Sequence, residues 1–175
     1  MTPVVALMVA LAPAQEPSAG NKVYKQVVPS VAYIRTGKAS GSGTLIDKER
    51  RLVLTNYHVI EGAERPGQNA GYEPVQVYFP EFEGSRPKTD RNYYKGKPGL
   101  RGEVIAVNRR QDLAVVQLNR DPKDAPEVKL AGTSPGPGDP IHSIGNAGAS
   151  GALWGYVRGS VRNVYPKQWK AKVGN

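Results

Sequence analysis

The 175-residue sequence contains no cysteine and only two histidines. The absence of cysteine excludes disulfide bonds, thiolate nucleophiles and cysteine-ligated zinc or iron–sulfur centres. Two histidines leave little material for a structural metal site, so we expect neither a metal nor a cofactor. The chemistry of this chain must therefore rest on Ser, Asp, Glu and His side chains, or on charge.

The apolar run at the start of the chain, Val4–Ala12, has only nine residues. It is too short to cross a bilayer as a helix, so no stable membrane span is expected. A short apolar run followed by the small-x-small sequence Ala12-Pro13-Ala14 is typical of a secretory signal peptide, although no Lys or Arg precedes it here. We predict that residues 1–14 are a signal peptide and that the protein is exported to the bacterial periplasm or beyond the cell.

Positive charge is in excess, with 24 Lys and Arg against 15 Asp and Glu. It is concentrated in residues 85–110, which hold eight basic and two acidic residues, and in residues 156–175, which hold five basic residues and no acid. One interpretation is a solvated surface that keeps the protein soluble. The other is a preference for an acidic partner. No helix-turn-helix pattern or RNA-binding signature accompanies the charge, so we do not expect a nucleic-acid partner.

Short strands and turns dominate the rest of the chain, in which one residue in five is Gly or Pro. A short helix is predicted over Asn21–Val28, ended by Pro29. Residues 81–100 hold two prolines, three glycines and several basic residues, and are predicted to form a long basic surface loop. Period-two patterns and short apolar runs predict strands at 31–35, 43–46, 52–54, 75–79, 103–107, 113–118, 140–144 and 155–164. Many short strands and no long amphipathic helix are typical of an all-β barrel or sandwich.

Three segments carry candidate chemistry. Gly41–Asp47 is a strand punctuated by glycines, Leu52–Ile60 is an apolar strand that leads to His58, and Asp112–Leu118 places an acid directly before an apolar strand. Alone, each is a weak signal, because a single His after a strand is most often structural and an Asp at a strand start is most often a turn residue.

Taken together, these segments resemble the trypsin-like serine proteases, and among them the HtrA-like (Deg) branch. In that family a Gly-Ser-Gly strand leads to a Thr-Asn-x-His-Val segment, here Thr55–Val59, and a later Asp-Leu-Ala-Val strand follows, here Asp112–Val115. Val28–Val31 resembles the opening strand of the family. Gly138–Pro140, with Ile144–Asn146, resembles the start of its second barrel.

The resemblance implies an all-β, trypsin-like double β-barrel. Residues 15–29 would form an N-terminal segment with the short helix, and residues 30–127 a complete first barrel. Residues 128–175 would form only the first strands of a second, truncated barrel.

The resemblance also implies a serine endopeptidase that cleaves protein or peptide substrates through an acyl-enzyme and needs no cofactor. The excess of positive charge would favour acidic substrates among them. His58 would take the proton of the nucleophilic serine, and Asp112 would orient the imidazole and stabilise its charged form. The two residues are 54 positions apart. That separation is long for the HtrA-like branch, and the 81–100 loop would fill the excess and lie near the rim of the active site.

The nucleophile itself is missing, because the family's Gly-(Asp/Asn)-Ser-Gly-Gly segment does not occur in this sequence. The serine at 134 lies in a Gly-x-Ser-x-Gly pattern, but Pro135 follows it and has no N–H for an oxyanion hole. The others lie in expected strands or in a glycine-rich turn. We therefore expect an inactive N-terminal fragment, and accept as nucleophile none of the serines that follow Asp112: Ser134, Ser143, Ser150 and Ser160.

His142, Trp154 and Trp169 are predicted to be structural. Two other functional readings stay open. A protease-fold binding module without catalysis would capture an acidic partner with its basic loop, and it would lack a downstream Gly-x-Ser-Gly-Gly segment. A basic nucleic-acid binder would show a steep salt dependence of binding, but it has little support in the sequence.

Overall fold

The structure is a computed structural model that describes residues 18–65, 71–147 and 151–165. The predicted signal peptide at 1–14 lies outside the described residues, as do Ser150 and Trp169. In the described ranges, no helix has the length and apolar character needed to cross a membrane.

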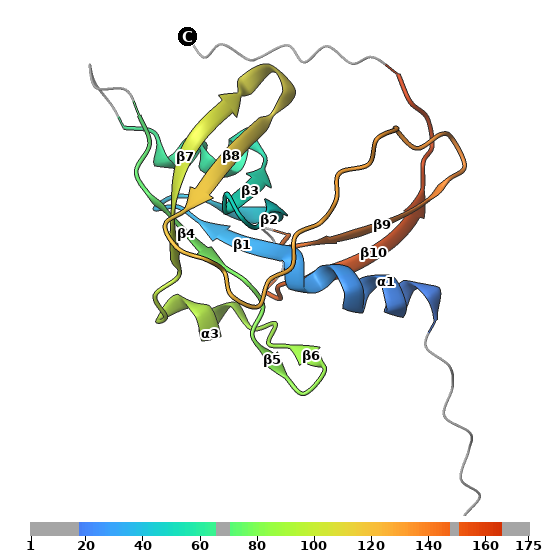
Figure 1. The fold of residues 1–175 in the computed structure, drawn as a ribbon, viewed down its shortest axis with the longest axis horizontal. Coiled ribbons are helices and arrows are strands. Elements are labelled where there is room, and N and C mark those ends of the chain that lie inside the picture. Colours follow the sequence, from blue (N-terminus) through green and yellow to red (C-terminus); the bar gives the residue numbers. More distant parts are fainter. Residues whose placement is uncertain (1–17, 66–70, 148–150, 166–175) are drawn as a thin grey trace, which may run out of the picture.

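Six strands close into an antiparallel barrel with the order β1-β2-β3-β8-β7-β4 (Figure 1). The all-β prediction is confirmed, and the strand that follows Asp112 has the predicted bounds. The strands predicted at 43–46, 52–54 and 103–107 are longer than predicted, because backbone pairing continues beyond their apolar patterns, and the strand predicted at 75–79 ends one residue earlier. The barrel strands are β1 Val31–Arg35, β2 Ser40–Asp47, β3 Leu52–Thr55, β4 Val75–Tyr78, β7 Leu100–Asn108 and β8 Leu113–Leu118.

The barrel interior is filled by small and branched aliphatic side chains. Strands β2 and β3 bury every second residue, as expected for strands with one face on a core. Val59 and Ile60 enter this core from α2 (Tyr57–Ile60), so the helix that carries His58 is anchored by its own buried residues. Each such buried side chain contributes about 1.5–3 kcal/mol.

A helix and a hairpin lie beside the barrel (Figure 1). Helix α1 (Ala19–Val27) is followed by the 3₁₀ turn η1 (Val28–Ser30). The hairpin consists of β9 (Pro140–Gly145) and β10 (Gly155–Ser160), which pair only with each other; β10 ends earlier than predicted. The assignment of these two strands to the start of a second barrel stays a prediction.

The contact between helix and hairpin depends on a glycine. A Cβ atom at Gly20 would lie 2.3 Å from the Tyr156 hydroxyl of β10, so only glycine allows this approach. The Tyr24 hydroxyl donates a hydrogen bond of 3.0 Å to the Trp154 carbonyl, and its ring meets that of Tyr156 edge to face. The helix predicted over Asn21–Val28 therefore packs in a defined position, against Tyr156 and the Trp154 carbonyl.

The prediction of a loop at residues 81–100 is corrected by the structure. This insertion contains the small hairpin β5 (Phe82–Glu83) and β6 (Arg86–Pro87), and helix α3 (Arg91–Lys95), capped by Asp90. The prolines and glycines of this segment predict a loop, but they give no sign of Tyr94, the buried residue that anchors the insertion. Tyr94 is only 1% exposed.

The anchor connects the insertion to the rest of the fold. The Tyr94 ring packs edge to face against Tyr78 and Trp154, with centroids 5.8 and 5.2 Å away. The insertion lies at the Leu100 end of β7, whereas Asp112 follows the other end of that strand (Figure 1). The helix of the insertion reaches back toward β2, because the Arg91 guanidinium donates to the Ser40 hydroxyl at 3.3 Å. The expected place of the insertion at the rim of the active site stays a prediction.

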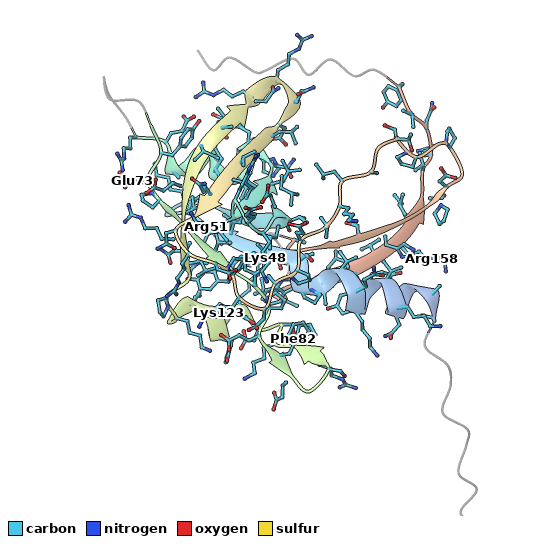
Figure 2. The ribbon with its side chains drawn as sticks, viewed as in Figure 1. Lys48, Arg51, Glu73, Phe82, Lys123 and Arg158 are labelled. Carbon is cyan, nitrogen blue, oxygen red and sulfur yellow. The ribbon has the colours of Figure 1, made fainter. Side chains whose placement is uncertain are left out.

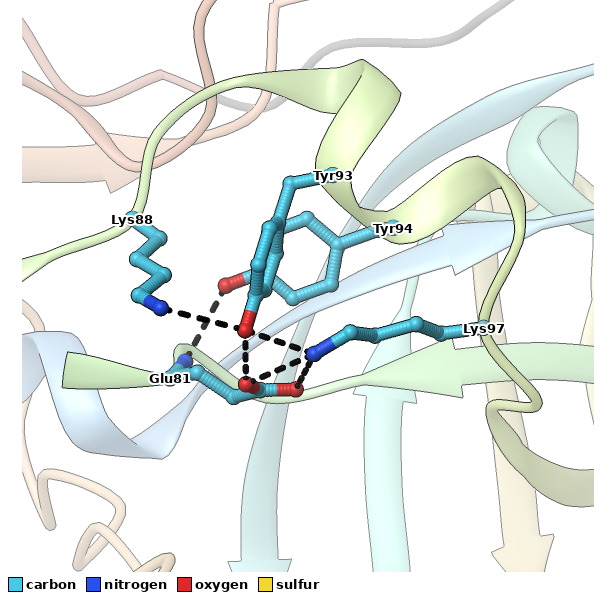
Figure 3. Close-up of polar contacts among 5 residues, drawn as sticks. All are labelled: Glu81, Lys88, Tyr93, Tyr94 and Lys97. Carbon is cyan, nitrogen blue, oxygen red and sulfur yellow. Dashed lines mark hydrogen bonds and ion pairs between the residues drawn. The ribbon is translucent and has the colours of Figure 1, made fainter.

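Several charges of the insertion are engaged within it. The Lys97 ammonium donates to both oxygens of Glu81, at 3.0 and 2.9 Å, and to the Tyr93 hydroxyl at 2.6 Å (Figure 3). Lys88 donates to the same hydroxyl at 3.2 Å. Hydrogen bonds from Tyr93 and Lys97 hold the pKa of Glu81 below its ordinary value. These cations therefore contribute to the structure of the insertion.

The segment after β8 crosses back over the barrel. The Lys48 ammonium donates to the Lys123 carbonyl at 2.7 Å, and the Lys48 backbone N–H donates to the Glu127 carboxylate at 2.7 Å. Lys48 and Lys123 are labelled in Figure 2. The Val128 N–H donates to the Leu45 carbonyl at 2.9 Å. These bonds lead the chain from the barrel toward β9.

Candidate active site

His58 lies on a single helical turn that begins where β3 ends. Asn56 precedes α2 in an extended conformation, and the buried Val59 fixes the turn to the barrel. A Cβ atom at Gly41 of β2 would lie 2.4 Å from a Val59 methyl, so a glycine is needed there for α2 to pack. The His58 side chain points outward and is 66% exposed.

Asp112 lies on the tight connection from β7 to β8. It follows the 3₁₀ turn η3 (Arg109–Gln111) and has φ 54°, in the left-handed region. The Asn108 side chain accepts from the Gln111 N–H at 3.0 Å and so closes the turn. Asp tolerates the left-handed region better than most residues, which suits it to this position.

The pairing of β3 with β8 brings the two residues together. Thr55, just before the His58 turn, is opposite Ala114, just after Asp112. The His58 Nδ1 atom lies 2.8 Å from the Asp112 Oδ2 atom. The His58 backbone N–H also donates to Asp112 Oδ1 at 2.9 Å, which satisfies a first-turn N–H that the helix leaves unpaired.

Asn56 completes the surroundings of the carboxylate, and the sequence analysis did not single it out. Its amide donates to the Asp112 carbonyl at 3.0 Å and to Asp112 Oδ2 at 3.3 Å. Its place in the Thr-Asn-x-His segment was the available signal. The amide thus holds both the backbone and the side chain of Asp112.

These contacts decide the charge of Asp112. Burial raises the pKa of this carboxyl, but hydrogen bonds from the His58 backbone and ring and from Asn56 outweigh it, and the pKa lies below its ordinary value. An ionised carboxylate at this position selects the proton on His58 Nδ1. The Nε2 atom of the neutral ring then has a free lone pair and can accept a proton.

The serines that follow Asp112 lie elsewhere in the described structure. Ser134 is exposed on the segment between β8 and β9, Ser143 lies on β9 and Ser160 on β10. None of these three shares a hydrogen bond with His58.

The other residues singled out as structural have partners in the fold. His142 Nδ1 lies 2.7 Å from the Tyr156 hydroxyl, within the β9–β10 hairpin. Trp154 is 1% exposed and donates its indole N–H to the Val31 carbonyl at 2.8 Å. Within the described parts of the chain, no three His, Asp or Glu side chains gather into a metal-binding cluster.

Comparison with solved structures finds the same fold. The chain is similar to the Rv3671c protease in its inactive form, with a TM-score of 0.61 and 21% identity over 93% of this chain and 68% of that one. An inactive-form mutant of Rv3671c from M. tuberculosis H37Rv matches with a TM-score of 0.49 and 22% identity, over 77% of this chain and 53% of that one. No curated protein matches the sequence.

The comparison with protein families covers most of the chain, including the segments that hold His58 and Asp112. The model of the trypsin-like peptidase domain matches residues 41–174. The match extends from the glycine-punctuated strand β2, through the barrel strands that follow it in the chain, to the β9–β10 hairpin and beyond. The chain belongs to the trypsin-like peptidase domain family.

Proposed function

We propose that this chain carries the general base and the orienting acid of a serine endopeptidase of the HtrA-like branch. His58 is the base and Asp112 the acid. The observation that supports the proposal is the bond of 2.8 Å between His58 Nδ1 and Asp112 Oδ2, with the Nε2 side of the ring toward solvent. This is the arrangement that activates a serine hydroxyl for acyl transfer.

In the proposed mechanism, a serine oxygen attacks the carbonyl carbon of the peptide bond while His58 Nε2 takes the hydroxyl proton. The imidazolium that forms is stabilised by the Asp112 carboxylate. It then gives its proton to the leaving amine, and an acyl-enzyme remains. Water attacks the ester with His58 again as the base, and the serine is regenerated.

The serine must come from outside the 175 residues, because no Gly-(Asp/Asn)-Ser-Gly-Gly segment lies within them. We therefore expect that the 175 residues alone hydrolyse no peptide bond. Joined to such a segment, they form the base side of the catalytic centre.

The first test reads the source DNA beyond codon 175 and then expresses the full reading frame. We expect a Gly-(Asp/Asn)-Ser-Gly-Gly segment, cleavage of a denatured protein substrate and labelling of one serine by a fluorophosphonate. His58→Ala should lower kcat by about 10⁶-fold and Asp112→Asn by about 10⁴-fold. His142→Ala, the matched histidine control, should leave kcat unchanged.

Two outcomes would contradict the proposal. One is a reading frame that stops or replaces the serine, which would favour a binding module without catalysis. The other is peptidase activity that survives His58→Ala, which would place the base elsewhere.

A further inference from the structure

A second cluster of polar side chains lies next to the His58–Asp112 pair. The Glu64 Oε1 atom accepts three hydrogen bonds, from the Tyr57 hydroxyl at 2.7 Å, the Arg109 guanidinium at 2.6 Å and the Tyr72 hydroxyl at 3.3 Å. The Arg109 guanidinium also lies over the Tyr57 ring, 5.2 Å from its centroid. Glu64 thus joins two nearby tyrosines to Arg109, which lies 45 positions away in sequence.

The donors lie beside the two residues of the site. Tyr57 directly precedes His58 on α2, and Arg109 is the first residue of η3, whose carbonyl accepts the Asp112 N–H at 3.3 Å. Glu64 follows the 3₁₀ turn η2 (Glu61–Ala63), which continues α2, and is bridged to Tyr72 by backbone pairing. One carboxylate therefore ties the turn that carries His58 to the turn that carries Asp112.

The cluster is charge-assisted. Hydrogen bonds from Tyr57, together with Arg109, hold the pKa of Glu64 below its ordinary value. Burial and the hydrogen bond to Glu64 raise the pKa of Tyr57 to about 12. Both groups keep their protonation states through the neutral range. Hydrogen bonds to an ionised acceptor are stronger than those between neutral groups.

We propose that Glu64 is a positioning residue that holds the His58 and Asp112 turns at their bonding distance. The importance of this role for catalysis rests on the function proposed above. The hydrogen bonds by which Glu64 joins the two turns do not depend on it. Both turns are single and short: α2 spans four residues and η3 spans three. Such turns have few hydrogen bonds of their own, so a contact that crosses between them limits their relative movement.

The competing explanation is an exposed ion pair that contributes almost nothing. The two explanations predict opposite shifts of the Asp112 pKa in the variant Glu64→Gln. If Glu64 acts only through its charge, its removal takes away a nearby negative charge and frees Arg109, and both effects lower the pKa of Asp112. If Glu64 positions the turns, its loss weakens the bonds from His58 and Asn56 to the Asp112 carboxylate, and the pKa of Asp112 rises.

The experiment follows the Asp112 carboxyl carbon by ¹³C NMR as the pH falls, in the 175-residue protein and in Glu64→Gln. We expect an upward shift of the Asp112 pKa in the variant. No shift, or a downward one, would overturn the proposal. Glu73→Gln is the matched control, because the Glu73 carboxylate accepts a hydrogen bond of 2.7 Å from Arg65 nearby, and among the described residues it shares no hydrogen bond with Tyr57 or Arg109. It should leave the Asp112 titration unchanged.

A second variant keeps the test decisive if Glu64→Gln does not fold. Tyr57→Phe changes no charge and removes one hydrogen bond of the cluster, so we expect the Asp112 pKa to rise here too, and an unchanged value contradicts the proposal. In the full-length enzyme, Glu64→Gln should lower kcat and leave KM unchanged. Because the NMR result needs no peptidase activity, failure of the proposed function and failure of the positioning role are distinguishable.

Discussion

His58 and Asp112 are bonded twice, through the ring at 2.8 Å and through the His58 backbone N–H at 2.9 Å. The two oxygens of one carboxylate therefore hold both the orientation of the imidazole and the start of the helical turn that carries it. A substitution at Asp112 therefore affects both the imidazole ring and the backbone N–H of His58. Stability and the proposed chemistry are linked at this residue.

This link predicts a pH dependence of stability. The pKa of Asp112 is lowered in the folded protein, so its carboxylate stabilises the fold above the unfolded-state pKa, near 3.8, and this stabilisation is lost as the pH falls through the folded-state pKa. Asp112→Asn should be less stable than the wild type near neutral pH, and this difference in unfolding free energy should become smaller in acid. Urea unfolding at about pH 7 and about pH 3 measures both gaps.

The control for this experiment is Asp121→Asn, an exposed aspartate on the segment after β8. It should follow the wild type at both pH values. A gap for Asp112→Asn that is equally wide in acid would show that the carboxylate charge contributes nothing.

Gly41→Ala should disturb α2. The new Cβ atom would lie 2.4 Å from a Val59 methyl, so the strand or the helix must shift. Overpacking of this kind costs about 1–3 kcal/mol of unfolding free energy. Denaturant unfolding measures the loss, and the NMR signals of His58 should move with it.

Gly37→Ala is the matched control, because nothing lies within 4 Å of a Cβ atom at that position. It should be neutral or slightly stabilising. If both alanine variants behave alike, the packing of Val59 against β2 is not what holds α2 in place.

Tyr94→Ala should release the 81–100 insertion from the barrel. The lost ring is buried between Tyr78 and Trp154, and truncation of a buried aromatic side chain costs about 3–5 kcal/mol. Limited proteolysis should then cut within residues 81–100. Lys95→Ala, on the exposed side of the same helix, should change neither stability nor cleavage. Resistance of Tyr94→Ala to cleavage would mean that other contacts hold the insertion.

Trp154→Phe should leave a buried carbonyl without its donor. The indole N–H bonds the Val31 carbonyl at 2.8 Å, and a buried acceptor that loses its partner costs about 1–3 kcal/mol. Thermal or urea unfolding measures the difference. Tyr165→Phe, at an exposed aromatic position, should lie within about 0.5 kcal/mol of the wild type. If both variants are equally stable, the hydrogen bond from the Trp154 indole does not contribute to stability.

The barrel was predictable because its strands are written in local patterns. β3 and β8 are short apolar runs bounded by polar residues, and such runs indicate strands whatever the rest of the chain does. The insertion was not predictable in the same way. Whether Tyr94 is a surface or a buried residue depends on Tyr78 and Trp154, and the Trp154 position lies 60 residues further along the chain.

The candidate site divides along the same line. The residue types and order around His58 and Asp112 are local, and by their resemblance to a known family they identified both positions from the sequence alone. Their bond, the support from Asn56 and the cluster around Glu64 exist only because β3 pairs with β8 and places η3 beside α2. Side-chain periodicity and turn chemistry act between neighbours in sequence, and so they determine elements. Contacts between residues 45 or 54 positions apart depend on the register of the closed barrel, which only the tertiary structure decides.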